Sequence, residues 1–521
     1  MKYTNSIFYL IIFLSTVFIG CQGKIDVKKI PLTSTSEEAK TAFFEGIYRY
    51  DQNEVDESNA AFKRALELDP NFELVKLYYD TKSPEQNRNN IIEAYNNREK
   101  VSEVEKGLIE AEYQLRIYGD LSQCINVLKS VIEKYPDIPY LYELTAYRQS
   151  FNKDFDDAIT NWKKGLELNP NSYFSALGLG LLHITVGSEF RYMPEDRIDL
   201  DEAESWLKLA QSIRPNASAT PRFLGNLYRA KYDLESALKS YETAVNMNTE
   251  KTSMLMEQTL MLAHTHTAMG NYEIAREYYE KTIDLSINDA WVAINNTYYT
   301  FSLLYEKKYD DAIKRLSEAE LKVDGLSGDR EVIEWGKNRL EFIKFLAFGH
   351  SQRIEETKIS LGKLDDFADR QAKTRLERSV DELERKNIER GLKVGKLFRS
   401  SWFNILFGNY EIAQSQLDTM YEIQNTRIEK NPDALNGYYN LSGYLNLMQG
   451  NVEESISMYD KVLERGDLDE YNRYFYALAL KAVGELDKSK QIFTELANNP
   501  FANWQIAMVK NLAKAQIKTN I

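Results

Sequence analysis

The side chains that most often bind metals or act as catalytic bases are few in this sequence. Its four histidines are His183, His264, His266 and His350, and none stands in a metal-binding spacing such as HExxH. His264 and His266 are two positions apart, so on a helix they point to different faces and cannot share a metal ion. The sequence also lacks a glycine-rich phosphate loop, a GxSxG turn and a Cys/His pair that helical hairpins would bring together. We therefore predict a protein that is not an enzyme and has no catalytic residues, no metal and no cofactor.

Cys21 offers a different chemistry, because it follows a segment typical of secreted precursors. Residues 7–19 form an apolar run of about 13 residues, which suits a signal-peptide core and is shorter than the ~20 residues that cross a bilayer as a helix. Lys2 is the only basic side chain before this run. Residues 18–20, Phe-Ile-Gly, stand directly before the cysteine. This arrangement predicts a processed and exported chain.

The segment resembles the bacterial lipobox, with Phe18 where that motif usually has leucine. The resemblance implies cleavage before Cys21, thioether diacylation of its side chain and acylation of its new amine. Residues 1–20 are then a signal peptide, and residues 21–36 are a tether that holds the protein to a membrane by several acyl chains. Gln22 is not the aspartate that retains lipoproteins in the inner membrane of some bacteria, which favours the outer membrane of the bacterial cell envelope. The alternative is an uncleaved amino-terminal anchor.

Any binding site in the rest of the chain must be held by helical hairpins, and residues 218–249 show the pattern most clearly. Large and small residues recur there at spacings of three and four, first in Leu224, Gly225 and Tyr228 and then in Ala237, Tyr241 and Ala244. Such stripes make two helices pack on each other. Gly225 and Ala237 are small where the others are large, so a large side chain of one helix can sink between turns of the other.

The small residue that opens the second helix recurs along the chain. The aligned positions are Ser58, Cys124, Ala158, Ala203, Ala237, Ala275, Ala312, Ala413, Ser455 and Ser489. The steps from 124 to 158, from 203 to 237 and from 455 to 489 are each 34 residues, whereas the step from 312 to 413 is 101. Cys124 is interpreted as buried filler at one of these positions, so we predict no disulfide. Repetition of this kind is typical of a solenoid.

These positions resemble those of the tetratricopeptide repeat (TPR), whose units are 34 residues long. The resemblance implies an all-α, TPR-like α-solenoid of antiparallel helical hairpins that binds a protein partner along the concave face lined by its first helices. The family pattern places nine residues in this peptide-binding groove: Glu143, Tyr147, Arg222, Asn226, Arg229, His264, Asn440, Tyr444 and Tyr474. Arg222 and Asn226 match part of the clamp with which some TPR proteins hold a carboxyl terminus. Leu260 and Met261 stand where polar clamp residues are needed, so that mode of recognition is not expected.

The repeat signal divides the chain after the tether into three parts. Residues 37–325 are the predicted N-terminal TPR-like array, and residues 401–521 are the C-terminal TPR-like array with a capping helix. Residues 326–400 are a divergent charged helical segment, in which residues 363–390 carry dense charges of both signs and predict a long exposed hairpin. This segment is either a hinge between the arrays or an arm that binds a partner.

The predicted capping helix is apolar on one side. Trp504, Met508 and Leu512 share one face of it. The other face, which we expect to be solvated, carries Lys510, Lys514 and Lys518. One-sided polarity is what the last helix of a solenoid requires.

Composition narrows the class of function. A net charge of −14 without a basic stripe argues against nucleic acid as a partner. We predict a lipid-anchored, non-catalytic scaffold or adaptor of the cell envelope that binds other proteins. One alternative is a SusD-like carbohydrate-binding outer-membrane lipoprotein, a family with long loops and exposed tryptophan, whereas this chain has 11 Pro and 6 Trp. The other is an adaptor whose hairpin at 363–390 binds one obligate partner.

Overall fold

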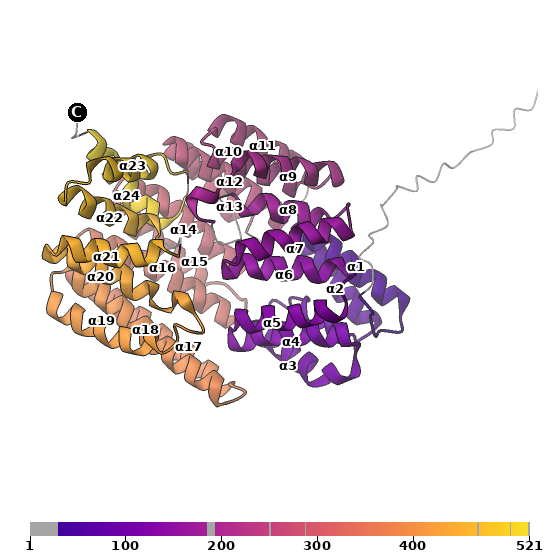
Figure 1. The fold of residues 1–521 in the computed structure, drawn as a ribbon. Coiled ribbons are helices and arrows are strands. Elements are labelled where there is room, and N and C mark those ends of the chain that lie inside the picture. The colour runs from indigo at the N-terminus through magenta and orange to yellow at the C-terminus, as the bar shows by residue number, and fades with distance from the viewer. Residues whose placement is uncertain are drawn as a thin grey trace, which may run out of the picture.

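Stacked pairs of antiparallel helices make up the protein (Figure 1). The computed structural model describes residues 30–184, 193–248, 252–286, 288–465, 468–500 and 502–518. Over these ranges the chain forms 24 α-helices, joined by short turns and a few 3-10 helices, and no strand. The prediction of an all-α, TPR-like solenoid is therefore confirmed.

The first array pairs its helices in chain order. The pairs are α1 (Glu37–Asp51) with α2 (Val55–Leu68), α4 (Glu103–Tyr118) with α5 (Leu121–Lys134), α6 (Pro139–Asn152) with α7 (Phe155–Leu168), α8 (Tyr173–Leu182) with α9 (Leu200–Ile213), α10 (Ala219–Ala230) with α11 (Leu234–Asn246), α12 (Ser253–Met269) with α13 (Tyr272–Asp284), and α14 (Asp289–Tyr305) with α15 (Tyr309–Asp324). The regular pairing is interrupted by η1 (Glu73–Leu77), α3 (Pro84–Asn97), η2 (Arg98–Lys100) and η3 (Glu195–Arg197).

The remaining helices continue the same stacking. The pairs are α16 (Arg330–His350) with α17 (Ile354–Glu377), α18 (Glu382–Leu406) with α19 (Tyr410–Asn425), α20 (Asn436–Gln449) with α21 (Val452–Leu463), and α22 (Glu470–Ala482) with α23 (Leu486–Ala497), followed by α24 (Trp504–Lys518); η4 (Pro432–Leu435) precedes α20. Because α18 runs through residue 400, the charged segment and the C-terminal array share one helix.

The small residues that align the repeats occupy one structural position. Each of them, from Ser58 to Ser489, is the fourth residue of the second helix in its pair, and each is at most 2% exposed. Where the residue is serine, its hydroxyl donates to a carbonyl of the facing helix, as Ser58 does to Gly46 at 2.9 Å. Alanine, cysteine and hydrogen-bonded serine all fit because this is where the two helices approach most closely.

Glycines on the first helices receive aromatic rings from the second helices. A Cβ atom on Gly225 would lie 2.4 Å from the ring of Tyr241. Gly46 meets Phe62 at 2.4 Å and Gly443 meets Tyr459 at 2.7 Å in the same way. The rings of Tyr241 and Phe62 are almost fully buried as a result. The pairing of small with large residues that the sequence predicted is therefore a direct contact.

One repeat escaped the sequence alignment. The pair α16 and α17 packs like the others, and Thr357 is the fourth residue of α17 and fully buried. Its hydroxyl donates to the carbonyl of Arg353 one turn earlier, at 2.6 Å, so the larger side chain is satisfied within its own helix. Threonine is not among the small residues used for the alignment, which is why the step from 312 to 413 looked like a gap.

The tip of the charged hairpin touches the N-terminal array. Figure 1 shows the ends of α17 and α18 beside α3 and α4. Arg88 binds Glu384 through one guanidinium nitrogen at 2.7 and 2.8 Å, and the hydroxyl of Tyr118 donates to Asp381 at 2.6 Å. These contacts are polar, and they close the superhelix between segments far apart in the chain.

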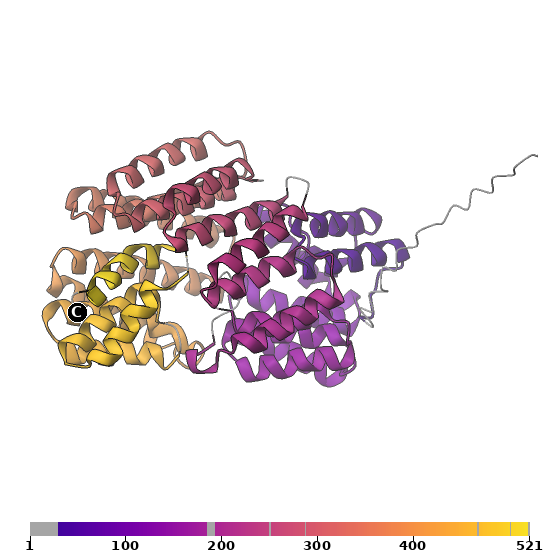
Figure 2. The same ribbon diagram turned by 90° about the horizontal axis from the view of Figure 1, so that it is seen from above.

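The C-terminal helix also packs on the middle of the chain, as the view from above shows (Figure 2). Helix α24 lies against α14 as well as α22 and α23. Lys510 is only 1% exposed, which corrects the expectation that it lies on a solvated face. Its ammonium donates to the carbonyls of Asn499 at 2.8 Å and Ala268 at 3.4 Å. Burial lowers the pKa of Lys510 to about 7, with Lys514 and Arg229 acting in the same direction.

Substitution of glycine by alanine should have opposite effects at two positions. Gly225→Ala places a methyl group inside the ring of Tyr241, so we expect it to lower the free energy of unfolding by about 1–3 kcal/mol. Gly362→Ala lies on an exposed part of α17 with nothing within 4 Å, so we expect it to raise that free energy by up to about 1 kcal/mol. Urea unfolding of both variants measures the difference, and equal effects would contradict the close contact.

Candidate functional site

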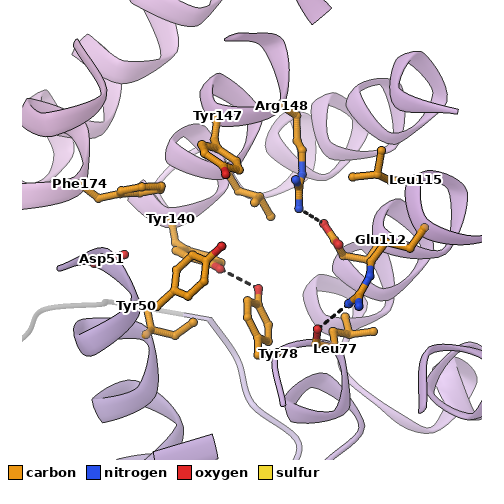
Figure 3. Close-up of a pocket in the computed structure, with 13 residues that line it drawn as sticks. Tyr50, Asp51, Leu77, Tyr78, Glu112, Leu115, Tyr140, Tyr147, Arg148 and Phe174 are labelled. Carbon is orange, nitrogen blue, oxygen red and sulfur yellow. Dashed lines mark hydrogen bonds and ion pairs between the residues drawn. The ribbon is translucent and has the colours of Figure 1, made fainter. Parts of the chain in front are cut away.

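A pocket of about 390 Å³ lies between the first hairpins of the chain (Figure 3). Its lining comes from α1, η1, α4, α6 and the start of α8. Aromatic rings provide much of the wall, from Tyr50, Tyr78, Tyr140, Tyr147 and Phe174. The volume lies in the range of about 300–1,000 Å³ that is usual for ligand pockets. We call it the Arg148 pocket, after the cation that lies among these rings.

Three first helices contribute to the pocket by the same spacing. Each uses positions i, i+3 and i+4, which share one face of a helix. The contributing residues are Ile47, Tyr50 and Asp51 on α1, Glu112, Leu115 and Arg116 on α4, and Leu144, Tyr147 and Arg148 on α6. Each set ends in a charged residue, so stacking the hairpins brings several charges to one place.

Arg148 and Glu112 form the central ion pair of the pocket. The Nη2 atom of Arg148 donates to the carboxylate of Glu112, and both side chains are largely buried. The Nε–H of Arg148 is also buried, and no acceptor lies within hydrogen-bond distance of it among the described residues. Arg116 donates from Nη1 to the carbonyl of Leu77 at 2.8 Å. Donor capacity therefore remains on the arginine side of the pocket.

Hydroxyl and carboxyl groups line the other side. The hydroxyls of Tyr78 and Tyr140 are 2.6 Å apart, and only one of their two protons can lie in that bond. Burial raises the pKa of the Asp51 carboxyl to about 8, although Arg214, 3.8 Å away, acts in the opposite direction. Asp51 is therefore mostly protonated at neutral pH and can donate a hydrogen bond itself.

The groove residues expected from the sequence are mostly enclosed by the protein. Arg222 is paired with Glu257, and Asn226 accepts from the hydroxyl of Tyr241 at 2.6 Å. Arg229 is 1% exposed and donates to the carbonyl of Pro500 at 2.6 Å. At Arg229, helix α10 therefore contacts the chain's own C-terminal segment.

The other expected groove residues are spread over the solenoid. Glu143 and His264 are buried, Glu143 accepting from Ser172 and Ser175 and His264 lying 2.9 Å from the hydroxyl of Tyr279. In the C-terminal array Tyr444 and Tyr474 are buried and Asn440 is half-buried. Tyr147 alone of the nine lines the Arg148 pocket. That these residues bind a partner stays a prediction.

Sequence reasoning missed most of the Arg148 pocket. Arg148, Arg116, Glu112 and Asp51 were not singled out, because no local motif marks them. The signal that was available is the repeated i, i+3, i+4 spacing that ends in a charged residue on consecutive first helices.

Other chemistry is sparse in the part of the chain that the structure describes. Among those residues, no group of three or more His, Cys, Asp or Glu side chains is placed so that it could hold a metal ion. Burial raises the pKa of the Cys124 thiol to about 12, which makes it a poor nucleophile. The expected lipidation site, Cys21, lies outside the described residues. Among the described helices, none combines the length and the apolar character needed to span a bilayer.

A family comparison identifies one of the repeats. Residues 258–287 match the family model described as Tetratricopeptide repeat. The match covers most of α12 and all of α13. The chain therefore carries at least one tetratricopeptide repeat within its stack of hairpins.

Individual proteins are more distantly similar. The chain is 26% identical over 148 residues to anaphase-promoting complex subunit 3 of Schizosaccharomyces pombe, and the aligned part is 28% of this chain and 20% of that relative. The solved structure of a tetratricopeptide repeat protein from Parabacteroides merdae is 13% identical in sequence. The superposition includes 99% of that protein and 58% of this chain, with a TM-score of 0.33. PilF of Pseudomonas aeruginosa is 15% identical in sequence. The superposition includes 96% of PilF and 48% of this chain, with a TM-score of 0.30.

The raised pKa of Asp51 makes a testable contribution to stability. Because only the folded state holds this proton between about pH 4 and pH 8, the associated stability falls progressively over that range and is lost above pH 8. Asp51→Asn keeps a neutral group at every pH. We therefore expect the melting temperature of this variant, relative to that of the wild type, to be higher at pH 9 than at pH 6. Asp156→Asn, which changes an exposed carboxylate, is the control. A constant difference between Asp51→Asn and wild type at both pH values would show that Asp51 is ionised throughout.

Proposed function

We propose that this protein is a non-catalytic scaffold that binds a protein partner through the Arg148 pocket and the inner helix faces around it. One observation carries the proposal: the first helices of successive pairs place tyrosines and arginines around a single pocket. Tyrosine and arginine are the side chains that most often anchor protein interfaces. The tetratricopeptide repeat at 258–287 supports a role in protein binding, which is the usual role of such repeats.

The pocket is suited to hold one side chain of a partner segment rather than a whole helix. Its walls come from five elements, α1, η1, α4, α6 and α8, and its volume of about 390 Å³ is near the lower end for ligand sites. Tyr147 packs near Phe174, with ring centres 5.9 Å apart, and the guanidinium of Arg148 lies 5.3 Å from the Tyr147 ring. These rings are held by their neighbours before a partner arrives, which lowers the entropic cost of binding.

We further propose that the protein is attached to a membrane of the bacterial cell envelope through lipid on Cys21. The support is in the sequence: an apolar run at residues 7–19, the Phe-Ile-Gly segment before the cysteine and Gln22 after it. Gln22 favours the outer membrane as the place of attachment. The scaffold would then hold its partner close to the membrane surface.

Capture of the partner tests the scaffold function. The protein is crosslinked in its own cells, extracted from membranes and purified, and the bound species are identified by mass spectrometry. We expect Tyr147→Ala to reduce the yield of one defined protein about tenfold, since it removes an anchor residue. Tyr421→Ala, on the exposed side of α19, should leave the yield unchanged. Equal yields from both variants, or recovery of oligosaccharide in place of protein, would contradict the proposal.

Fractionation tests the membrane attachment separately. Wild-type protein should be found with membranes and should incorporate a labelled fatty acid. Cys21→Ala should lose the label, because the thiol of Cys124 is buried and cannot be acylated in its place. Retention of the label in Cys21→Ala would place the lipid elsewhere and contradict this part of the proposal.

A further inference from the structure

The Arg148 pocket has more hydrogen-bond donors than acceptors. Arg148 has a buried Nε–H without an acceptor among the described residues, and Arg116 uses one Nη on a carbonyl and makes no ion pair within them. The hydroxyls of Tyr78 and Tyr140 share one hydrogen bond, so one of their two O–H groups can still donate to a ligand. On the acceptor side, Glu112 is already engaged by Arg148. A ligand rich in acceptors would satisfy groups that the protein itself leaves unpaired.

The charge of the pocket also favours an anion. Two guanidinium groups, of Arg116 and Arg148, stand against one paired carboxylate, that of Glu112. Asp51 adds little negative charge at neutral pH, because burial raises its pKa to about 8. The pocket is thus positive by about one charge, in a chain whose net charge is −14.

The remaining surface of the pocket is apolar. Ile47, Leu77, Leu115, Leu144 and Phe174 line it together with the ring faces of the tyrosines. A ligand that presented only a charged group would leave this surface in contact with water. A large apolar side chain placed against this surface removes it from water, which favours binding.

We propose that the Arg148 pocket recognises a partner segment that carries a bulky apolar side chain next to a carboxylate. The inference rests on the proposed scaffold function and names the feature of the partner that is read. The apolar side chain lies against Leu144, Phe174 and the tyrosine rings, and the carboxylate accepts from Arg148 and Arg116. A doubly charged phosphate fits less well, because it would lie beside the buried carboxylate of Glu112.

A matched set of peptides tests this specificity with the full-length protein. In a Gly/Ser frame, each peptide carries Phe, Leu or Ala followed by Asp, Asn or Lys, with both ends capped. A second set ends in Phe with a free carboxyl group, which separates a terminal carboxylate from a side-chain one. Affinities are measured by fluorescence polarisation. We expect Phe-Asp and Leu-Asp to bind about tenfold more tightly than Phe-Asn, Leu-Asn or Ala-Asp.

Two variants connect the preference to the named residues. Arg148→Lys keeps a positive charge beside Glu112 but loses the guanidinium fork, and Arg116→Gln removes an exposed charge; each should reduce the preference of Asp over Asn to about threefold or less. Lys129→Gln, which removes an exposed cation on α5, should leave it unchanged. Circular dichroism checks that each variant is folded.

The outcomes separate this inference from the scaffold function. Equal binding of Phe-Asp and Phe-Asn, or a preference that survives both arginine variants, would overturn it. Failure of all the peptides to bind, while Tyr147→Ala still loses the captured partner, would overturn the proposed specificity and leave the scaffold function standing. Tighter binding of the free carboxyl set would assign the carboxylate to a chain terminus.

Discussion

The close approach of two helices at one small residue determines the rest of this structure. That residue is the fourth of each second helix, and it is buried against the facing helix. The space there accepts a small side chain, or a slightly larger one whose hydroxyl is hydrogen-bonded. Once the helices touch there, an aromatic ring such as that of Tyr241 is held against a glycine such as Gly225. Repetition of this contact stacks the first helices side by side, and residues at equal spacing on them then meet in one pocket.

The sequence predicts this architecture well because the contact is local. Ser58 and Ala237 are separated from the residues they touch by less than one repeat, so periodicity reveals them. Thr357 was missed because its hydroxyl is satisfied inside its own helix, which lets a larger residue occupy the same place. The pocket was missed for another reason, since Asp51 and Arg148 come together only through the packing of successive hairpins. Periodicity also could not predict the contact of Arg229, because the carbonyl it binds, that of Pro500, is 271 residues away in the chain.

Some enclosed cations in this protein bind backbone carbonyls at the carboxyl ends of helices, whereas others, such as Arg222 and Lys344, pair with carboxylates. Arg214 donates to the carbonyl of Tyr48 in the last turn of α1, and Lys510 donates to that of Ala268 in the last turn of α12. Helix carboxyl ends carry unpaired carbonyls and partial negative charge, so a cation placed there satisfies both. These contacts join hairpins that are far apart in the chain.

The contact between Arg88 and Glu384 has a consequence for folding. Most hairpins touch only their neighbours in the chain, and such contacts form quickly because the loops they close are short. The Arg88–Glu384 pair closes a loop of 296 residues and adds only a polar contact to the interface. Helix α24 also packs on α14, so the two arrays share an apolar core as well, and the Arg88–Glu384 pair is one of several contacts that join distant parts of the chain. Because the Arg88–Glu384 contact is polar, we expect it to separate on warming or in denaturant before the helices themselves unfold.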